Sequence, residues 1–381
     1  MTLKVALVTE SFLPSANGVT TSVLRVLDTF KQRGFEALVI APTSVSPRHN
    51  GFPVHVMATV PVMQFPVAVP GPSIQRELDE FQPDVIHVAA PFMMGARAIS
   101  WGAKNNVPVI AVYQTDLGGY MNRYGLKFAR TVVDKMMASI HANADINLAP
   151  TQEAASYLKQ IGVRNVEVWG RGVDLDLFHP ANKESTDVLA LRKKLAPKGE
   201  TIIGFVGRLA TEKQVNRMSE LLSLPNTSFV IVGDGPERSK LEKQFAGHKV
   251  YFAGRQTGIE LSNYYAALDI FVHFGTEETF GQTIQEAQAT GLAVVAPNVG
   301  GPKYLIDDRV SGLLANPERP YGYREKVLEL LEDENLQASL ALEARRAVAN
   351  KSWEVNNSKL IEFYQRAISQ KATKVASIEL A

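Results

Sequence analysis

The chain has 381 residues, and its 40 Lys and Arg residues nearly balance its 39 Asp and Glu residues. This length exceeds the size at which a single hydrophobic core stops growing, so two domains are expected. The near-neutral charge, without a run of like charges, argues against nucleic acid as the main partner. The absence of cysteine excludes thiol catalysis, disulfides and cysteine-ligated zinc.

The start of the chain, residues 1–9, is a strand-like run that lacks the charged start and the cleavage site of a signal peptide. No segment contains the roughly 20 apolar residues that a membrane helix needs. We therefore expect a soluble protein.

Apolar strands alternate with helical stretches through the first half of the chain. Residues 3–9 fit a buried strand, residues 20–33 have helical periodicity and end at Gly34, and residues 37–41 fit the next strand. This alternation predicts a parallel sheet, with ligands outside the carboxyl ends of its strands. Further strands are expected at 54–57, 84–88, 109–113, 145–148 and 166–169, with helices such as 95–104 and 151–160.

Three loops of this half are of interest. The turn at 10–18 carries Gly18 just ahead of a helix, where a glycine lets backbone approach a phosphate, although Gly18 is equally well an ordinary turn glycine. The loop after 109–113 carries Asp116, which could bind a hydroxyl group or stabilise a turn. Residues 58–73 are rich in proline and large apolar residues, so they are neither a central strand nor a helix. This segment is either a lipid-facing patch or a buried connection.

The second half repeats the alternation after a segment at 170–180 that has turn character and marks a domain boundary. Arg208 and Lys213 follow its first strand. Two such cations can converge on a diphosphate and stabilise it as it departs. In other sequence contexts an Arg-Lys pair usually lies on a solvent-exposed surface without a function. The strands of this half are expected at 201–207, 228–232, 250–253, 270–273 and 293–296.

The segment 274–291 carries the most chemistry. A helix is expected from near Phe280 to just before Gly291, with Glu278 in the loop ahead of it and Glu286 inside it. The first backbone N–H groups of such a helix, those of residues 281–283, favour a phosphate. Helices are further expected at 320–331, 335–351 and 353–368, and the last dozen residues are expected to fray.

These motifs together resemble a known family. The Glu278-x7-Glu286 spacing with Gly300-Gly301 beyond it, and the strings ESFLPSANGVTTSVLRVL, YQTDLGGY, WGRGVDLDLFHP, GFVGRLATEKQV and VIVGDGPER, resemble the retaining glycosyltransferases of family four. In detail they are similar to GDP-mannose-dependent α-mannosyltransferases that elongate glycolipids. The resemblance implies the GT-B fold, an α/β architecture of two Rossmann-like domains with parallel sheets facing across a cleft. It implies an acceptor-binding domain at 1–170, a nucleotide-sugar-binding domain at 171–352, and a segment at 353–381 whose helix crosses back to the first domain.

The resemblance also implies roles for individual residues. Glu278 would contact the donor sugar and Glu286 the ribose. Many family members have a histidine where Asp116 stands, so we assign Asp116 to hydroxyl binding more readily than to base catalysis. The implied catalytic residues are Arg208, Lys213, Glu278 and Asp116. The implied donor-binding residues are Gly18, Arg208, Lys213, Arg255, Gln256, Glu278, Thr279, Phe280, Gly281, Gln282, Thr283 and Glu286, and the implied acceptor-binding residues are Asp116 and Tyr120.

The expected activity is retaining transfer of mannose from GDP-mannose to a hydroxyl group of a glycolipid, by front-face departure in which the leaving phosphate helps to deprotonate the acceptor. No metal and no cofactor are expected, because the seven histidines show no paired ligand spacing and fixed positive groups take the place of a cation. The expected location is the cytoplasm, with peripheral contact to the inner face of the membrane.

Three alternative functions are distinguished by features of the sequence. The enzyme could use a UDP-hexose donor and a soluble acceptor. A nucleotide-sugar-binding protein without turnover would lack a member of the set Arg208, Lys213, Glu278 and Glu286, and none is missing. A nicotinamide-dependent oxidoreductase is disfavoured because neither half has a complete G-x-G-x-x-G fingerprint.

Overall fold

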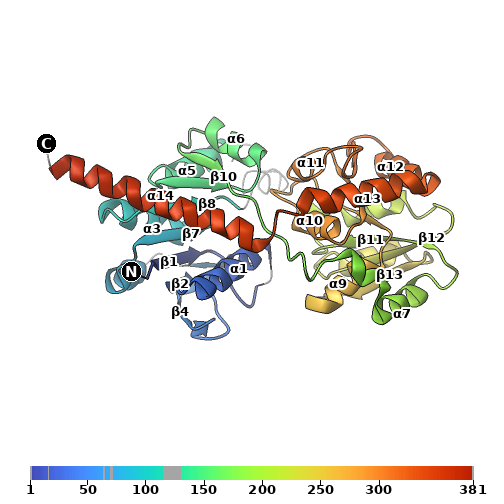
Figure 1. The fold of residues 1–381 in the computed structure, drawn as a ribbon, viewed down its shortest axis with the longest axis horizontal. Coiled ribbons are helices and arrows are strands. Elements are labelled where there is room, and N and C mark those ends of the chain that lie inside the picture. Colours follow the sequence, from blue (N-terminus) through green and yellow to red (C-terminus); the bar gives the residue numbers. More distant parts are fainter. Residues whose placement is uncertain (1, 16, 63–64, 69–71, 115–129, 380–381) are drawn as a thin grey trace. The chain divides into compact units, whose positions relative to one another are not determined.

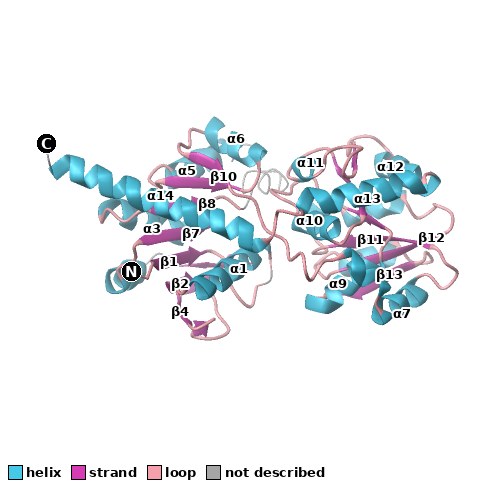
Figure 2. Cartoon of the chain, viewed as in Figure 1, coloured by secondary structure: helices cyan, strands magenta, loops and turns pink. Residues whose placement is uncertain are grey.

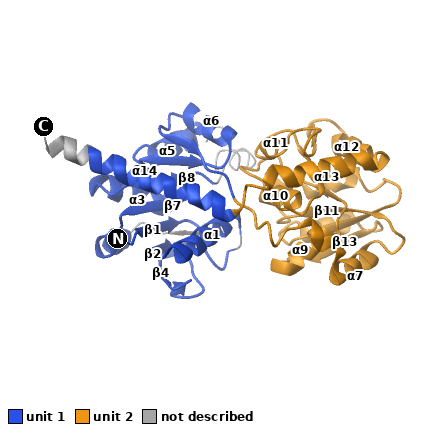
Figure 3. Cartoon of the chain, viewed as in Figure 1, with its two compact units in different colours: residues 1–171, 353–381 blue, residues 172–352 orange. Residues whose placement is uncertain are grey.

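The computed structural model describes all residues except 1, 16, 63–64, 69–71, 115–129 and 380–381 (Figure 1). The chain divides into two compact units (Figure 3). Unit 1 comprises Met1–Arg171 and Trp353–Ala381, and unit 2 comprises Gly172–Ser352. Each unit has its own sheet with helices packed on it (Figure 2), which confirms the predicted α/β class.

Unit 1 is built on an eight-stranded sheet of order β10-β9-β8-β7-β1-β2-β4-β3, in which only β3 and β4 pair antiparallel. Its strands are β1 (Lys4–Thr9), β2 (Glu36–Ala41), β3 (Arg48–His49), β4 (Phe52–Val56), β7 (Val85–Ala89), β8 (Val109–Val112), β9 (Ile146–Ala149) and β10 (Val166–Val168). Its helices are α1 (Gly18–Arg33), α2 (Ser73–Phe81), α3 (Met93–Lys104), α5 (Arg130–His141), α6 (Gln152–Gln160) and α14 (Trp353–Glu379).

Both faces of this sheet are covered. Val5 and Leu7 of β1 pack in one cluster with residues of α1 and α14, whereas Ala6 and Val8 pack in another cluster with residues of α2 and α3. All four side chains are fully buried. A strand that is buried on both faces reads as a continuous apolar run, which is why β1 could be predicted without an alternating pattern.

The proline-rich residues 58–73 contain a small separate pair of strands, in which β5 (Thr59–Val62) pairs antiparallel with β6 (Phe65–Ala68). This two-stranded sheet lies outside the eight-stranded one. The expectation that the segment is not a central strand is therefore confirmed.

The C-terminal helix is longer than predicted. We expected the last dozen residues to fray, but α14 continues to Glu379, because the segment after Ile368 contains good helix formers and neither glycine nor proline. Buried polar contacts hold α14 to unit 1: Tyr364 Oη lies 2.7 Å from His87 Nδ1, and Asn357 donates to Thr29 Oγ1 at 2.8 Å. Among the described helices none combines the length and the apolar composition that crossing a bilayer requires.

Unit 2 has a fully parallel sheet of order β13-β12-β11-β14-β15-β16. Its strands are β11 (Thr201–Val206), β12 (Thr227–Val232), β13 (Val250–Gly254), β14 (Ile270–Val272), β15 (Ala293–Pro297) and β16 (Leu313–Ala315). Its helices are α7 (Thr186–Leu195), α8 (Arg238–Gln244), α9 (Gly258–Ala267), α10 (Gln282–Ala289), α11 (Pro302–Leu305), α12 (Gly322–Glu332) and α13 (Glu334–Val348), with short 3₁₀ segments η2 (Pro180–Glu184), η3 (Thr211–Lys213) and η4 (Val215–Glu220).

Candidate functional site

The order of strands in unit 2 brings two chemically rich loops together. From β11 the chain first adds β12 and β13 on one side, and β14 then pairs with β11 on the other side. Ligands of open parallel sheets bind outside the carboxyl ends of the strands at such a reversal of order. The loop after β11 carries Arg208 and Lys213, and the loop after β14 carries Glu278.

The β11 loop presents its two cations differently. Arg208 is exposed and directly follows Gly207, whereas Lys213 is the last residue of η3 and is half-buried. The next residue, Gln214, adopts a left-handed conformation, and its amide donates to Thr276 Oγ1 at 2.7 Å. This hydrogen bond ties the loop after β11 to the loop after β14.

Lys213 and Glu278 form an ion pair between these loops. Their side chains are 22% and 18% exposed, so the pair is less screened by solvent than a surface salt bridge. His273, which follows β14, is buried behind the pair, with its Nε2 3.6 Å from Glu278 Oε1. Burial lowers the pKa of His273 to about 4, so the ring is neutral at pH 7.

Two glycines press against the Glu278 loop from behind. Gly301 N donates to Glu278 O at 2.7 Å, and a Cβ on Gly301 would lie 2.5 Å from Phe280 O. Gly300 has a φ of 67°, in the left-handed region that suits glycine. The Gly300-Gly301 pair noted in the sequence therefore sets the path of the loop that holds Glu278.

Helix α10 begins at Gln282, two residues later than predicted, because its N-cap Gly281 has a φ of 107°. The hydrogen bonds to Gly281 O come from Ile284 N and Gln285 N. The N–H groups of residues 281–283 thus precede the first intrahelical donors, as a phosphate site at a helix start requires.

Other predicted residues on this helix are held by side-chain contacts. Tyr265 Oη donates to Glu286 Oε2 at 2.9 Å, and burial together with the nearby carboxylate raises the pKa of Tyr265 well above its usual value. Gln282 donates to Gly172 O at 3.0 Å. The Phe280 side chain is buried in a cluster with Ile284, so Phe280 can offer a ligand only its backbone.

The remaining predicted residues are spread over the chain. Arg255 is exposed, and the amide of Gln256 donates to Ala253 O at 2.8 Å, which shapes the turn after β13. Thr279 and Thr283 are half-buried in the loop before α10 and in its first turn. Asp116 and Tyr120 lie outside the described residues.

Gly18 begins α1 in unit 1, and it packs against a residue that the sequence analysis did not single out. A Cβ on Gly18 would lie 2.3 Å from Nη1 of Arg171, whose side chain is 8% exposed. The N-cap Asn17 accepts hydrogen bonds from Val19 N and Thr20 N. Gly18 therefore makes room for a guanidinium group at the start of α1.

A carboxylate fixes a second helix at this edge of the unit 1 sheet. Glu10, which follows β1, accepts hydrogen bonds from Phe92 N, Met94 N and Gly95 N at 2.9 to 3.0 Å. Burial raises the pKa of Glu10, and these three hydrogen bonds oppose that rise. The loop after β1 and the start of α3 are thereby held together.

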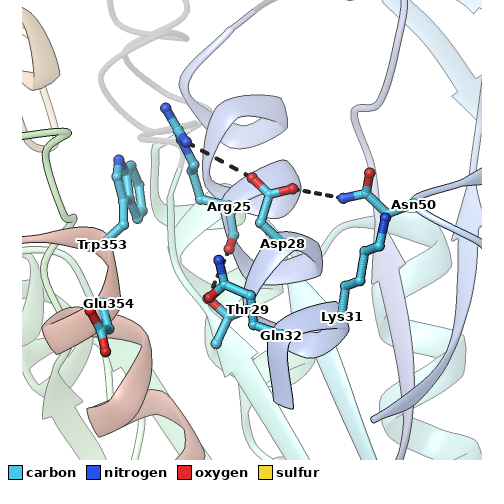
Figure 4. A pocket seen from close by; sticks show the side chains of 8 residues that line it. All are labelled: Arg25, Asp28, Thr29, Lys31, Gln32, Asn50, Trp353 and Glu354. Carbon is cyan, nitrogen blue, oxygen red and sulfur yellow. Dashed lines mark hydrogen bonds and ion pairs between the residues drawn. The ribbon is translucent and has the colours of Figure 1, made fainter. Parts of the chain in front are cut away.

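A shallow groove of about 320 Å³ also lies in unit 1, between α1 and the first residues of α14 (Figure 4). Asp28 contacts both Arg25, at 3.9 Å, and Asn50, at 2.7 Å, so polar groups of the groove are engaged with each other. None of the predicted site residues lines this groove. We therefore keep the candidate site at the carboxyl ends of the strands.

His273, Tyr265, Arg171 and Glu10 were missed from the sequence. A lone histidine or tyrosine in an apolar run is usually a core residue, and Arg171 and Glu10 stood inside motifs without a spacing that marked them.

Among the described residues no group of three or more His, Asp or Glu side chains could hold a metal ion.

Comparisons with known proteins agree over nearly the whole chain. Residues 16–177 match "Glycosyltransferase Family 4", and residues 189–347 match "Glycosyl transferases group 1". The chain is 38% identical to the GDP-mannose-dependent alpha-mannosyltransferase of Corynebacterium glutamicum, over 96% of this chain and 90% of that protein. It is also 38% identical to the enzyme of the same name from Mycobacterium tuberculosis, over 98% and 99%. The crystal structure of Anabaena HepE in complex with UDP is similar in fold, with a TM-score of 0.81 at 20% identity over 96% of this chain and all of that one.

Proposed function

Because the chain belongs to glycosyltransferase family 4, as its near-full-length relatives show, we propose that it transfers mannose from GDP-mannose to a hydroxyl group of a glycolipid. The observation that carries the proposal is the Lys213–Glu278 ion pair between the loops after β11 and β14. In this proposal Lys213 is the cation for the diphosphate, and Glu278 is the carboxylate for the sugar hydroxyls. Two relatives that are named for GDP-mannose support this choice of donor.

The charges of the site suit departure of a nucleoside diphosphate. As the sugar leaves, negative charge accumulates on the β-phosphate, and Arg208, Lys213 and the first N–H groups of α10 supply fixed positive charge without a metal ion. We assign Glu278 to orienting the sugar hydroxyls and not to attacking the anomeric carbon. We propose retention of configuration, with the leaving phosphate taking the proton of the acceptor hydroxyl.

The other assignments complete the donor and acceptor sites. We propose that the start of α1 at Gly18 contributes to diphosphate binding, that Arg255 and Gln256 bind the base, and that Glu286 binds the ribose. Asp116 and Tyr120 are assigned to the acceptor.

The test uses purified full-length chain and a panel of nucleotide sugars that contains GDP-mannose and UDP-hexoses. We expect GDP-mannose to be consumed fastest, activity to persist in EDTA, and NMR of the product to show an α-mannoside. Faster turnover of a UDP-hexose would favour the alternative donor. Loss of activity in EDTA that returns with a divalent metal would contradict the metal-free mechanism.

The proposed lipid acceptor has its own test. Val60, in the proline-rich hairpin, is 48% exposed, which suits contact with a lipid surface. We expect Val60→Asp to weaken sedimentation of the chain with vesicles of phosphatidylglycerol. Val168→Asp is the matched control, because Val168 is similarly exposed on β10 of the same unit. Equal sedimentation of the two variants would argue against the hairpin as a membrane contact.

A further inference from the structure

A buried histidine stands directly behind the ion pair of the site. The ring of His273 stacks on Phe205 of β11, with centroids 6.3 Å apart and planes inclined by 24°. A Cβ on Gly275 would lie 3.1 Å from His273 Nε2, so this glycine leaves the nitrogen room on the side of the Glu278 loop. The ring is therefore fixed by packing, and its polar edge lies close to the site.

The polar environment of this ring is incomplete. Within the described chain neither ring nitrogen makes a hydrogen bond of full geometry, although the backbone of Gly275 acts on the ring and opposes the fall of its pKa. The 3.6 Å between Nε2 and Glu278 Oε1 is longer than a hydrogen bond. A buried donor without a well-formed hydrogen bond costs free energy, so a small movement of the carboxylate toward the ring is favoured. Because burial keeps the ring neutral at pH 7, the ring can donate one N–H without adding a charge to the site.

We propose that His273 is a positioning residue that holds Glu278 in place when Lys213 turns to the diphosphate of the nucleotide sugar. This inference rests on the proposed function. Lys213 is paired with Glu278, and a bound diphosphate competes for the same ammonium group. Hydrogen bonds around catalytic groups often tighten only when the substrate binds, so the contact between His273 and Glu278 shortens at that step.

A purely structural role makes a different prediction. If His273 only fills space beside Phe205, a phenylalanine at this position serves as well, and any loss of stability affects all ligands alike. If His273 acts through Glu278, its replacement weakens binding of the sugar part of the donor and leaves binding of the nucleotide part unchanged. The two roles therefore differ in the ratio of the affinities for GDP-mannose and GDP.

The experiment measures these two dissociation constants by calorimetry on the full chain. We expect His273→Phe to raise the dissociation constant for GDP-mannose about tenfold and that for GDP by less than about twofold. The reason is that the substitution removes one hydrogen bond to a carboxylate that touches only the sugar. His273→Gln keeps an N–H donor and is expected to retain most of the affinity ratio. Should His273→Phe fail to fold, His273→Leu carries the same test.

A double-mutant cycle with Glu278→Gln decides whether the effect passes through the carboxylate. We expect His273→Phe to change the affinity ratio by less than about twofold in that background. His87→Gln is the control for replacing a buried histidine, since His87 lies in the core of unit 1. An unchanged ratio in His273→Phe, or a full effect in the Glu278→Gln background, would overturn the role of His273. The cycle uses whichever nucleotide sugar the wild-type chain consumes, so a UDP-hexose preference would overturn only the proposed donor.

Discussion

The two units both carry glycines in the loops at the carboxyl ends of their strands, but different atoms pack against those glycines. In unit 2 a Cβ on Gly233 would lie 1.9 Å from Gly207 O, and Gly233 has a φ of 140°. In unit 1 a Cβ on Gly18 would meet the tip of the Arg171 side chain, and Gly18 does not adopt a positive φ.

This difference separates a constraint of the fold from a feature of the site. The hydrogen bond from Gly207 N to Val232 O limits how far the Gly207 backbone can move, so we expect a side chain at Gly233 to destabilise unit 2 strongly. A guanidinium group at the end of a flexible side chain can move. Gly18 therefore affects where the Arg171 side chain lies more than it affects the stability of unit 1. We therefore expect a substitution at Gly233 to cost more stability than the same substitution at Gly18.

The largest effect is expected from Gly233→Ala. The added methyl group collides with the Gly207 carbonyl in a conformation that alanine disfavours, so the free energy of unfolding of unit 2 should fall by about 4 kcal/mol or more. Urea unfolding followed by circular dichroism measures this change. All three tryptophans lie in unit 1, so tryptophan fluorescence follows that unit separately.

The matched control is Gly247→Ala. Gly247 also has a positive φ, of 84°, but a Cβ there meets nothing within 4 Å. We expect this variant to lose only about 1 to 2 kcal/mol, from backbone strain alone. Equal losses in the two variants would show that the contact between the loops of unit 2 is not rigid.

Lys213→Ala is expected to reduce kcat/KM by a factor of about 10² to 10³, because one fixed positive group opposite the departing diphosphate is lost. Steady-state kinetics with GDP-mannose measures this. Lys240→Ala is the control, since Lys240 is a largely exposed lysine that pairs with Glu237 in the same unit. A reduction of kcat/KM by less than about tenfold would indicate that the diphosphate does not bind at the loop after β11.

A smaller, pH-dependent effect is expected in unit 1 from His87, because burial lowers its pKa to about 3. The unfolded ring takes up a proton below about pH 6.5, whereas the folded ring stays neutral until about pH 3. The stability contributed by the neutral ring is therefore complete above pH 6.5 and is lost as the pH falls toward 3, by up to about 1.4 kcal/mol per pH unit.

Urea unfolding of wild type and His87→Gln, followed by tryptophan fluorescence between pH 7 and pH 5, tests this expectation. Carboxylates that titrate in both proteins cancel in the comparison. The variant should show the shallower dependence, and identical slopes would contradict the assignment.

The smallest effect on stability is expected from Gly18→Ala, at about 1 kcal/mol, because the added methyl group displaces only the end of a buried arginine. Urea unfolding followed by tryptophan fluorescence measures this loss in unit 1. In an Arg171→Ala background the same substitution should cost almost nothing. A loss of stability as large as that of Gly233→Ala would contradict the difference that we expect between Gly18 and Gly233.

Much of this architecture follows from local sequence. The apolar runs of β1 and β11 are buried on both faces and could be predicted from composition alone. The short helices α2, α5 and α7 were not predicted, because at most three residues are buried in each and the apolar signal is therefore short. The start of α10 was placed two residues early, because the left-handed conformation of Gly281 is a feature of the loop and not of helical periodicity.

The sequence by itself determined which residues stand at the carboxyl ends of strands, since a run of apolar residues locates its own strand and the polar residue that follows it. Arg208, Lys213 and Glu278 were found in this way. The tertiary structure decided that β14 pairs with β11, which brings Lys213 to Glu278 across 65 residues and buries His273 behind them. Strand pairing is a non-local choice made by the packing of the whole sheet, so no spacing in the sequence could have revealed these contacts.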